Sequence, residues 1–213
     1  MDIVTFLITY GILFLGELGD KTQLIVFNLA LEYKKFYKVG IGVTFGFAIL
    51  VTIGVFFGTV ITTFIPLFII SIVSGIFFII IGILEALKLK KLYLERKKTH
   101  IDSKEDNQKE TKNANNFSIR YSKFKNNPYL AGFLYIFIME LGDKTQLLTI
   151  TLSSIYTFPI EVWLGAFLAL VSVAWIGILL GAFIAQKIPK FYLKLISTSI
   201  FIFVGILILI TSF

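Results

Sequence analysis

The octapeptide ELGDKTQL occupies residues 17–24 and recurs, letter for letter, at residues 140–147. Each copy places two carboxylates, a lysine, a threonine and a glutamine inside a long apolar stretch. Ionised side chains are costly in a hydrocarbon environment and normally mark a functional site there. The duplicated octapeptide therefore predicts a functional site and indicates an internal repeat in the fold.

The surroundings of the two octapeptides are those of a membrane protein. The chain has 213 residues, of which 57% are hydrophobic, and its mean hydropathy is +0.88. Apolar runs of about 20 residues are long enough to span a bilayer core of ~30 Å. They predict an all-α protein with six transmembrane helices, at about residues 3–31, 39–61, 66–87, 128–153, 160–185 and 190–212. The chain has no cysteine, which excludes disulfides and thiolate metal ligands.

The basic residues follow membrane topology rather than a nucleic-acid partner. The formal net charge is +7, but 18 of the 20 lysines and arginines lie in or next to the loops after the first, third and fifth predicted spans. Those three loops share one side of the membrane, which the positive-inside rule identifies as cytoplasmic. We therefore expect a cytoplasmic basic linker at residues 88–127, both termini outside, contact with membrane lipid and no nucleic acid. A homodimer is left open.

The repeat extends well beyond the octapeptide. A shift of 123 residues without gaps brings the octapeptides into register, Glu17 with Glu140 and Asp20 with Asp143. It aligns five further matches of glycine or proline: Gly42 with Gly165, Gly54 with Gly177, Gly58 with Gly181, Pro66 with Pro189 and Gly82 with Gly205. The chain is therefore expected to contain a first three-helix repeat at residues 1–87 and a second at 128–213. Since three is odd, the second repeat would enter the membrane inverted. A 3+3 inverted repeat is typical of secondary transporters, whose sites lie near the bilayer midplane.

The four duplicated acids are the candidate metal ligands. Glu17 and Asp20 are three residues apart, so on a continuous helix they would share a face, and Glu140 and Asp143 would do the same. Additional oxygen ligands could come from Gln23, Gln146, Thr22 and Thr145, and Met139 could add a thioether. Gly19 and Gly142 could let the helices unwind there. Hard oxygen ligands favour ions such as Mg²⁺, Ca²⁺ and Mn²⁺.

The two lysines of the octapeptides balance part of this charge. Lys21 and Lys144 are expected to pair with Glu17 and Glu140, respectively, at four-residue spacing. Four carboxylates and two ammonium groups sum to −2, which one divalent ion or two protons would neutralise. This balance predicts exchange of a divalent cation for protons. Glu85, near the cytoplasmic end of the third span, is expected to reach the membrane interface.

Several other functions remain to be weighed. Four acids could also bind a small organic cation such as a basic amino acid, or form the acidic ring of a cation channel. A structural role, in which the polar residues hold two helices together, would be a costly use of four acids. The sequence contains no His-Glu-x-x-His motif, no cysteine and no histidine in a predicted span, so we expect no enzymatic activity and no resident cofactor.

The duplicated motif resembles the signature of the GDT-type cation/proton exchangers, which is two copies of E-x-G-D-[KR]-[ST]. Both copies match in full, at residues 17–22 and 140–145, and the resemblance covers nearly the whole chain. It implies transport of Mn²⁺ or Ca²⁺, since family members are calcium/manganese transporters of eukaryotic organelles and manganese exporters of bacteria. It also implies that Glu17, Asp20, Glu140 and Asp143 bind the ion. The short chain without a long N-terminal targeting extension suggests a bacterial type of exporter in the plasma membrane.

Overall fold

The structure of the chain is a computed structural model. It describes residues 2–18, 20, 22, 26–27, 29–30, 33, 35–98, 127–187 and 190–212, without the side chains of residues 88–98, 180–194, 197 and 211–212. Most of the basic linker predicted at residues 88–127 lies outside the described residues, as do Lys21 and Gln23 of the first octapeptide.

The described chain is helical. Its helices are α1 (Ile3–Glu17), α3 (Phe36–Phe64), α4 (Leu67–Lys98), α6 (Pro128–Glu140), α7 (Lys144–Ile155), α8 (Pro159–Lys187) and α9 (Lys190–Ser212). Local sequence explains several ends: Asp2 caps α1, Asn127 caps α6 ahead of Pro128, and Pro159 opens α8. The predicted spans at 3–31 and 128–153 are wrong as continuous helices, because α1 ends at Glu17 and α6 at Glu140.

The apolar helices differ in length. Within the described residues, three helical segments are long and apolar enough to cross a membrane: Phe36–Phe64, Leu67–Leu87 and Pro159–Leu179. Shorter apolar helices run over Ile3–Glu17, Pro128–Glu140 and Thr198–Ile210. Large apolar side chains are exposed along the outer faces of these helices, such as Phe64 at 82% and Ile210 at 71%. An outward apolar surface of this kind is suited to lipid contact.

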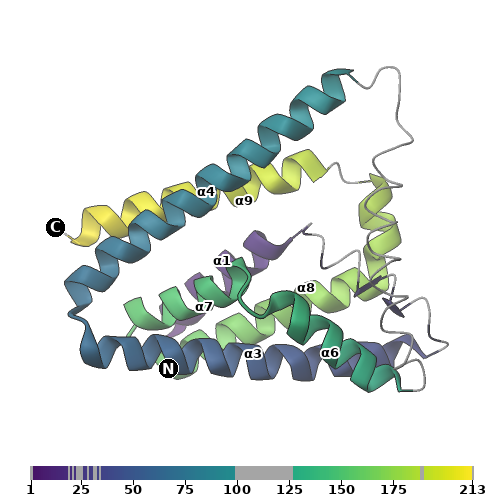
Figure 1. Cartoon of the computed structure of the whole chain (residues 1–213), viewed down its shortest axis with the longest axis horizontal. Helices are drawn as coiled ribbons and strands as arrows, with labels where there is room; N and C mark the ends of the chain where they lie inside the picture. The colour runs from purple at the N-terminus through teal and green to yellow at the C-terminus, as the bar shows by residue number, and fades with distance from the viewer. Residues whose placement is uncertain are drawn as a thin grey trace.

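The helix ends separate into two groups at opposite ends of the molecule. Figure 1 shows both termini on the left, whereas α3 and α6 begin, and α4 and α8 end, on the right. Helix α1 enters from the left and α6 from the right, and both stop near the middle of the bundle. Glu17 and Glu140, which end α1 and α6 and begin the two octapeptides, therefore reach the centre from opposite ends.

Glycines let the helices approach closely at positions related by the 123-residue shift. A Cβ atom added to Gly42 of α3 would lie 2.0 Å from the backbone oxygen of Tyr129 in α6. At the equivalent position in α8, a Cβ atom on Gly165 would lie 2.7 Å from the backbone oxygen of Phe6 in α1. Phe6 and Tyr129 are themselves equivalent in the two repeats. The same helix crossing thus occurs twice, and it fixes α1 and α6, which carry the site.

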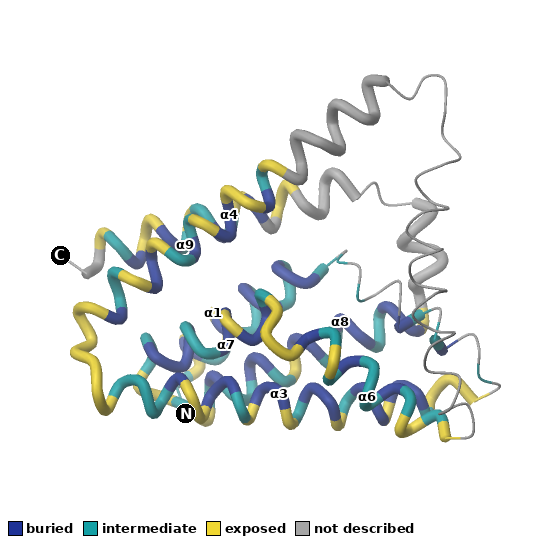
Figure 2. Tube along the Cα trace, viewed as in Figure 1, coloured by how far each residue is buried: buried dark blue, intermediate teal, exposed yellow. Residues whose placement is uncertain are grey.

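Helices α4 and α9 form a separate pair above this body (Figure 1). Their contact is close because Gly75 and Gly205 face each other's backbone, and Gly82 accommodates Ile202. Figure 2 shows the outward faces of this pair as exposed. Fully buried Phe78 and Phe201 form its inner contact, with ring centroids 6.3 Å apart, and the Phe201 ring fills the space beside Gly16 of α1.

Candidate functional site

Each octapeptide begins with a tight turn that interrupts the helix. In the second copy, Leu141 has φ −65° and ψ 113° and Gly142 has φ +80°, and the Asp143 N–H donates to the Glu140 carbonyl at 3.1 Å. These values define a type II β-turn, which requires a positive φ at its third position and therefore favours glycine there. The expectation that Gly142 lets the helix unwind is confirmed.

The first copy has the same backbone geometry where it is described. Leu18 has φ −63° and ψ 118°, and the Asp20 N–H donates to the Glu17 carbonyl at 3.1 Å. The turn places Glu17 at the end of α1 and Asp20 beyond it. The expectation that each Glu–Asp pair shares a helix face is therefore wrong, because a turn separates the two members of each pair.

The two glutamates are held by threonines of the opposite repeat. Thr145 donates a hydrogen bond to Glu17 Oε1 at 2.7 Å, and Thr22 donates one to Glu140 Oε1, also at 2.7 Å. Both glutamates are buried, with exposed fractions of 4% for Glu17 and 3% for Glu140. Since the 123-residue shift converts one hydrogen bond into the other, the two repeats exchange equivalent contacts at the centre of the protein.

Lys144 also contacts the opposite repeat. Its Nζ lies 2.5 Å from Asp20 Oδ2 and 3.4 Å from Glu17 Oε1, and it donates to the Gly16 carbonyl at 3.0 Å. The expected pairing of Lys144 with Glu140 within one helix is wrong, because the turn directs the lysine at the start of α7 towards the end of α1. The matching expectation for Lys21 and Glu17 lies outside the described residues.

The remaining predicted ligands occupy different environments. Asp143 is exposed and caps α7, with its Oδ1 accepting from the Lys144 N–H at 2.7 Å. Gln146 is buried in α7, at 8% exposure, while Met139 is half-buried and lines neither central cavity described below. Among the described residues, no three Asp, Glu, His or Cys side chains lie close enough together to hold a metal ion. The structure thus brings Glu17 and Glu140 together with the threonines but leaves Asp143 apart.

Two small cavities adjoin Glu140, and their linings are related by the repeat. The first is lined by Glu17, Thr22, Val26, Phe47, Glu140, Leu170, Val173 and Ala174. The second is lined by Phe47, Leu50, Val51, Glu140, Thr145, Gln146, Thr149 and Leu170. Phe47 and Leu170, which line both, are equivalent in the two repeats, as are Thr22 and Thr145. These apolar lining residues were not among the predicted site residues, although their spacing of 123 residues can be read from the sequence.

The two cavities differ in size. The first leaves about 10 Å³ for the centre of a water molecule, whereas the second leaves none. About one water-sized volume is the minimum needed to hold a water molecule. Equivalent linings therefore leave room for about one water molecule on one side of Glu140 and for none on the other.

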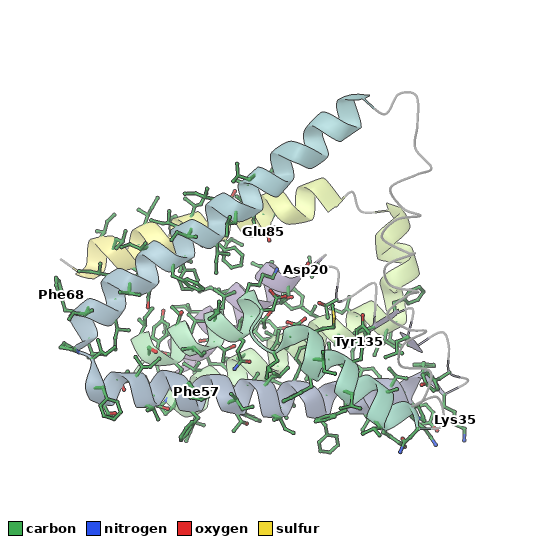
Figure 3. The ribbon with its side chains drawn as sticks, in the orientation of Figure 1. Asp20, Lys35, Phe57, Phe68, Glu85 and Tyr135 are labelled. Carbon is green, nitrogen blue, oxygen red and sulfur yellow. The ribbon has the colours of Figure 1, made fainter. Side chains whose placement is uncertain are left out.

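Glu85 of α4 is a buried acid, although its place in the sequence predicted that it would reach the membrane interface. Its exposed fraction is 7%, so the structure corrects that expectation. Its repeat equivalent is Ile208, which is also buried, so the pattern of duplicated acids could not identify Glu85. Figure 3 shows Glu85 on the same side of the bundle as Asp20.

Comparison with known proteins assigns the chain to a family. The family described as divalent cation/proton antiporter GDT1 matches residues 5–91 and 128–213. Neither the curated proteins nor the solved structures gave a match. The two matched segments contain one octapeptide each and cover all or most of every helix described above. The chain therefore belongs to the GDT1 family of divalent cation/proton antiporters.

Proposed function

We propose that the protein exports Mn²⁺, with Ca²⁺ as the alternative ion, from the cytoplasm in exchange for protons. Glu17, Asp20, Glu140 and Asp143 would bind the ion, and Thr22, Thr145 and Gln146 would support them. The protein would be a six-span transporter with a 3+3 inverted repeat, and it would have no enzymatic activity.

The observation that carries this proposal is the pair of buried glutamates at the centre. Glu17 and Glu140 line one cavity and each accepts a hydrogen bond from the opposite repeat. Within the described part of the chain, Glu140 Oε2 is buried without a hydrogen-bond partner. A buried carboxylate oxygen is costly unless a proton or a cation compensates it. Glu140 Oε2 is therefore the atom that we expect to take up the ion or the proton.

The proposed exchange follows from competition for these oxygens. A metal ion requires deprotonated carboxylates, so protonation of the glutamates would release it. The β-turns after Glu17 and Glu140 would let the two aspartates bind the ion one after the other. In this conformation Asp20 lies beside Lys144, while Asp143 caps α7. Closing one of the two equivalent cavities while the other opens would expose the glutamates to the two sides alternately.

The direction of transport rests on the charge of the loops. Lys35 is the N-cap of α3 and Lys38 lies in its first turn, while Lys187 ends α8 and Lys190 begins α9. The start of α3 and the end of α8 lie at the end of the molecule opposite the termini (Figure 1). The positive-inside rule would place this end in the cytoplasm and both termini outside. A plasma-membrane exporter would then release Mn²⁺ on the side of the termini.

The test is reconstitution into liposomes that contain a pH-sensitive dye. Addition of Mn²⁺ or Ca²⁺ outside should drive proton movement in wild-type vesicles, and Glu17→Gln and Glu140→Gln should each abolish it. Metal entry without proton movement would support an acidic-ring channel and refute exchange. Proton movement driven by a basic amino acid, with none driven by metal, would support the organic-cation alternative.

A further inference from the structure

The ammonium group of Lys144 has the surroundings of a bound cation. Three oxygens lie around its Nζ: the Gly16 carbonyl at 3.0 Å, Asp20 Oδ2 at 2.5 Å and Glu17 Oε1 at 3.4 Å. A backbone carbonyl and two carboxylates are also the ligand types that hard divalent ions prefer. The side chain of Lys144 is only 15% exposed, so these oxygens take the place of most of its hydration.

All three oxygens belong to the end of α1 and its turn, whereas Lys144 is the first residue of α7. The contact therefore depends on how the two repeats are placed relative to each other. Gly16 and Glu17 are the last two residues of α1, and the Phe201 ring packs against Gly16 where a Cβ atom would lie. The oxygens thus belong to one packed helix end, and the lysine comes to them from the other repeat.

We propose that Lys144 is a tethered counter-cation: its ammonium group occupies the Glu17–Asp20 half of the site in the unloaded carrier, and the transported ion has to displace it. This inference rests on the proposed function, since it assumes that Glu17 and Asp20 bind the ion. It differs from simple charge balance because the lysine and the ion compete for the same oxygens.

The competition has a consequence for transport. Two unpaired carboxylates in a buried site would be strongly destabilising, so a carrier without metal would be trapped unless another cation replaced the ion at Glu17 and Asp20. Lys144 supplies that cation from within the chain, while Glu140 takes up the proton of the exchange. Return of the metal-free, protonated carrier then depends on Lys144, whereas movement of the metal-loaded carrier does not.

The experiment compares two fluxes in vesicles that contain either wild-type protein or Lys144→Met. This substitution nearly keeps the length of the side chain and removes its charge. The first flux is net exchange of Mn²⁺ for protons, and the second is isotope exchange of Mn²⁺ for Mn²⁺, which needs only the loaded carrier. We expect Lys144→Met to lose net exchange by about tenfold or more, the effect of ~1.4 kcal/mol, while retaining isotope exchange. Its Mn²⁺ affinity should increase by about 5- to 150-fold, the range of typical coupling energies.

Two control variants accompany Lys144→Met. Lys144→Arg keeps the charge and should retain more net exchange than Lys144→Met. Lys38→Met removes a cation outside the site and should leave both fluxes unchanged. The Lys38 ammonium group lies 5.4 Å from the centroid of the Tyr129 ring. Equal losses of both fluxes in Lys144→Met, or an unchanged Mn²⁺ affinity, would overturn the inference.

A measurement on the wild-type protein avoids dependence on a variant that fails to fold. Amine labelling followed by peptide mass spectrometry should show greater modification of Lys144 when Mn²⁺ is bound, because the ion releases the ammonium group from its three oxygens. Unchanged labelling would contradict displacement. If wild-type vesicles carry neither Mn²⁺ nor Ca²⁺, the proposed function itself fails, whereas an active wild type with unchanged Lys144 labelling refutes only the role of Lys144.

Discussion

Replacing Gly42 by alanine tests whether close helix contact positions the site. The added Cβ atom would lie 2.0 Å from the Tyr129 carbonyl oxygen, and real Cβ atoms essentially never approach below 3.0 Å. Because the obstacle is backbone, α3 and α6 would have to separate by about 1 Å in a tightly packed interior. Overpacking of this kind costs about 1–3 kcal/mol. For a chain of this size that corresponds to a decrease of about 2–12 °C in Tm.

The same movement should reach the site, because α6 ends at Glu140. A misplacement of about 1 Å at a reacting group can reduce rates by ~10²-fold. We therefore expect Gly42→Ala to lower Tm in detergent and to reduce metal-driven proton flux in vesicles far more than protein yield.

Two further glycines provide graded controls. Gly165→Ala, whose Cβ would lie 2.7 Å from the Phe6 carbonyl oxygen, should show a smaller effect. Gly11→Ala should leave Tm and flux at or above wild-type values, because no atom lies within 4 Å of its added Cβ. If Gly42→Ala and Gly11→Ala had the same Tm and flux, the close approach of α3 and α6 and its coupling to the site would be refuted.

Three other predictions concern the turn, the threonines and the entry to α1. Gly142→Ala places a non-glycine residue at φ +80° and should lower the free energy of unfolding by about 1–2 kcal/mol. Gly142→Asn should lower it by less, because asparagine adopts positive φ more readily than alanine. Equal thermal stability of the two variants would contradict the turn. Thr145→Val removes the hydrogen bond to Glu17 and should weaken Mn²⁺ binding by about 3- to 20-fold, because a hydrogen bond between helices in a membrane contributes ~0.6–1.7 kcal/mol. Calorimetric titration with Mn²⁺ measures this change, with the exposed Thr63→Val as the control. The pKa of Asp2 lies below its usual value because the Thr5 hydroxyl donates to the Asp2 carboxylate. The ionised carboxylate therefore stabilises the fold at pH values above the ordinary Asp pKa, and this contribution is lost as the pH falls through the lowered pKa of the folded protein. Tm measured over a pH series should show this loss in wild type and not in Asp2→Asn.

The repeat and the helical class could be predicted because both depend on residue spacing. The 123-residue register predicted which glycines are equivalent, and the structure places Gly42 and Gly165 in equivalent helix crossings. Helix continuity could not be judged from hydropathy alone, since apolar residues continue on both sides of Glu140. The Leu-Gly dipeptide after each glutamate was the available signal, because a type II turn places glycine at its third position.

Candidate site residues could be proposed from the sequence, but their contacts could not. Two identical octapeptides with two acids each indicate a candidate site whatever their geometry, whereas contacts between repeats depend on tertiary packing. On a continuous helix Lys144 would pair with Glu140, but the turn directs the lysine to Asp20 and Glu17. Glu85 was misplaced for a different reason: its position near Lys88 suggested the interface, but packing of α4 against α9 and the body buries it.

The central claim is that Glu17 and Glu140 form one ion site shared by the two repeats. Radioactive Mn²⁺ binding to the purified protein tests it directly, in wild type, Glu17→Gln and Glu140→Gln. A shared site predicts one ion per chain, with binding lost in either single variant. Two ions per chain, with each variant losing one and retaining the other, would mean that the repeats bind separately and would contradict the account.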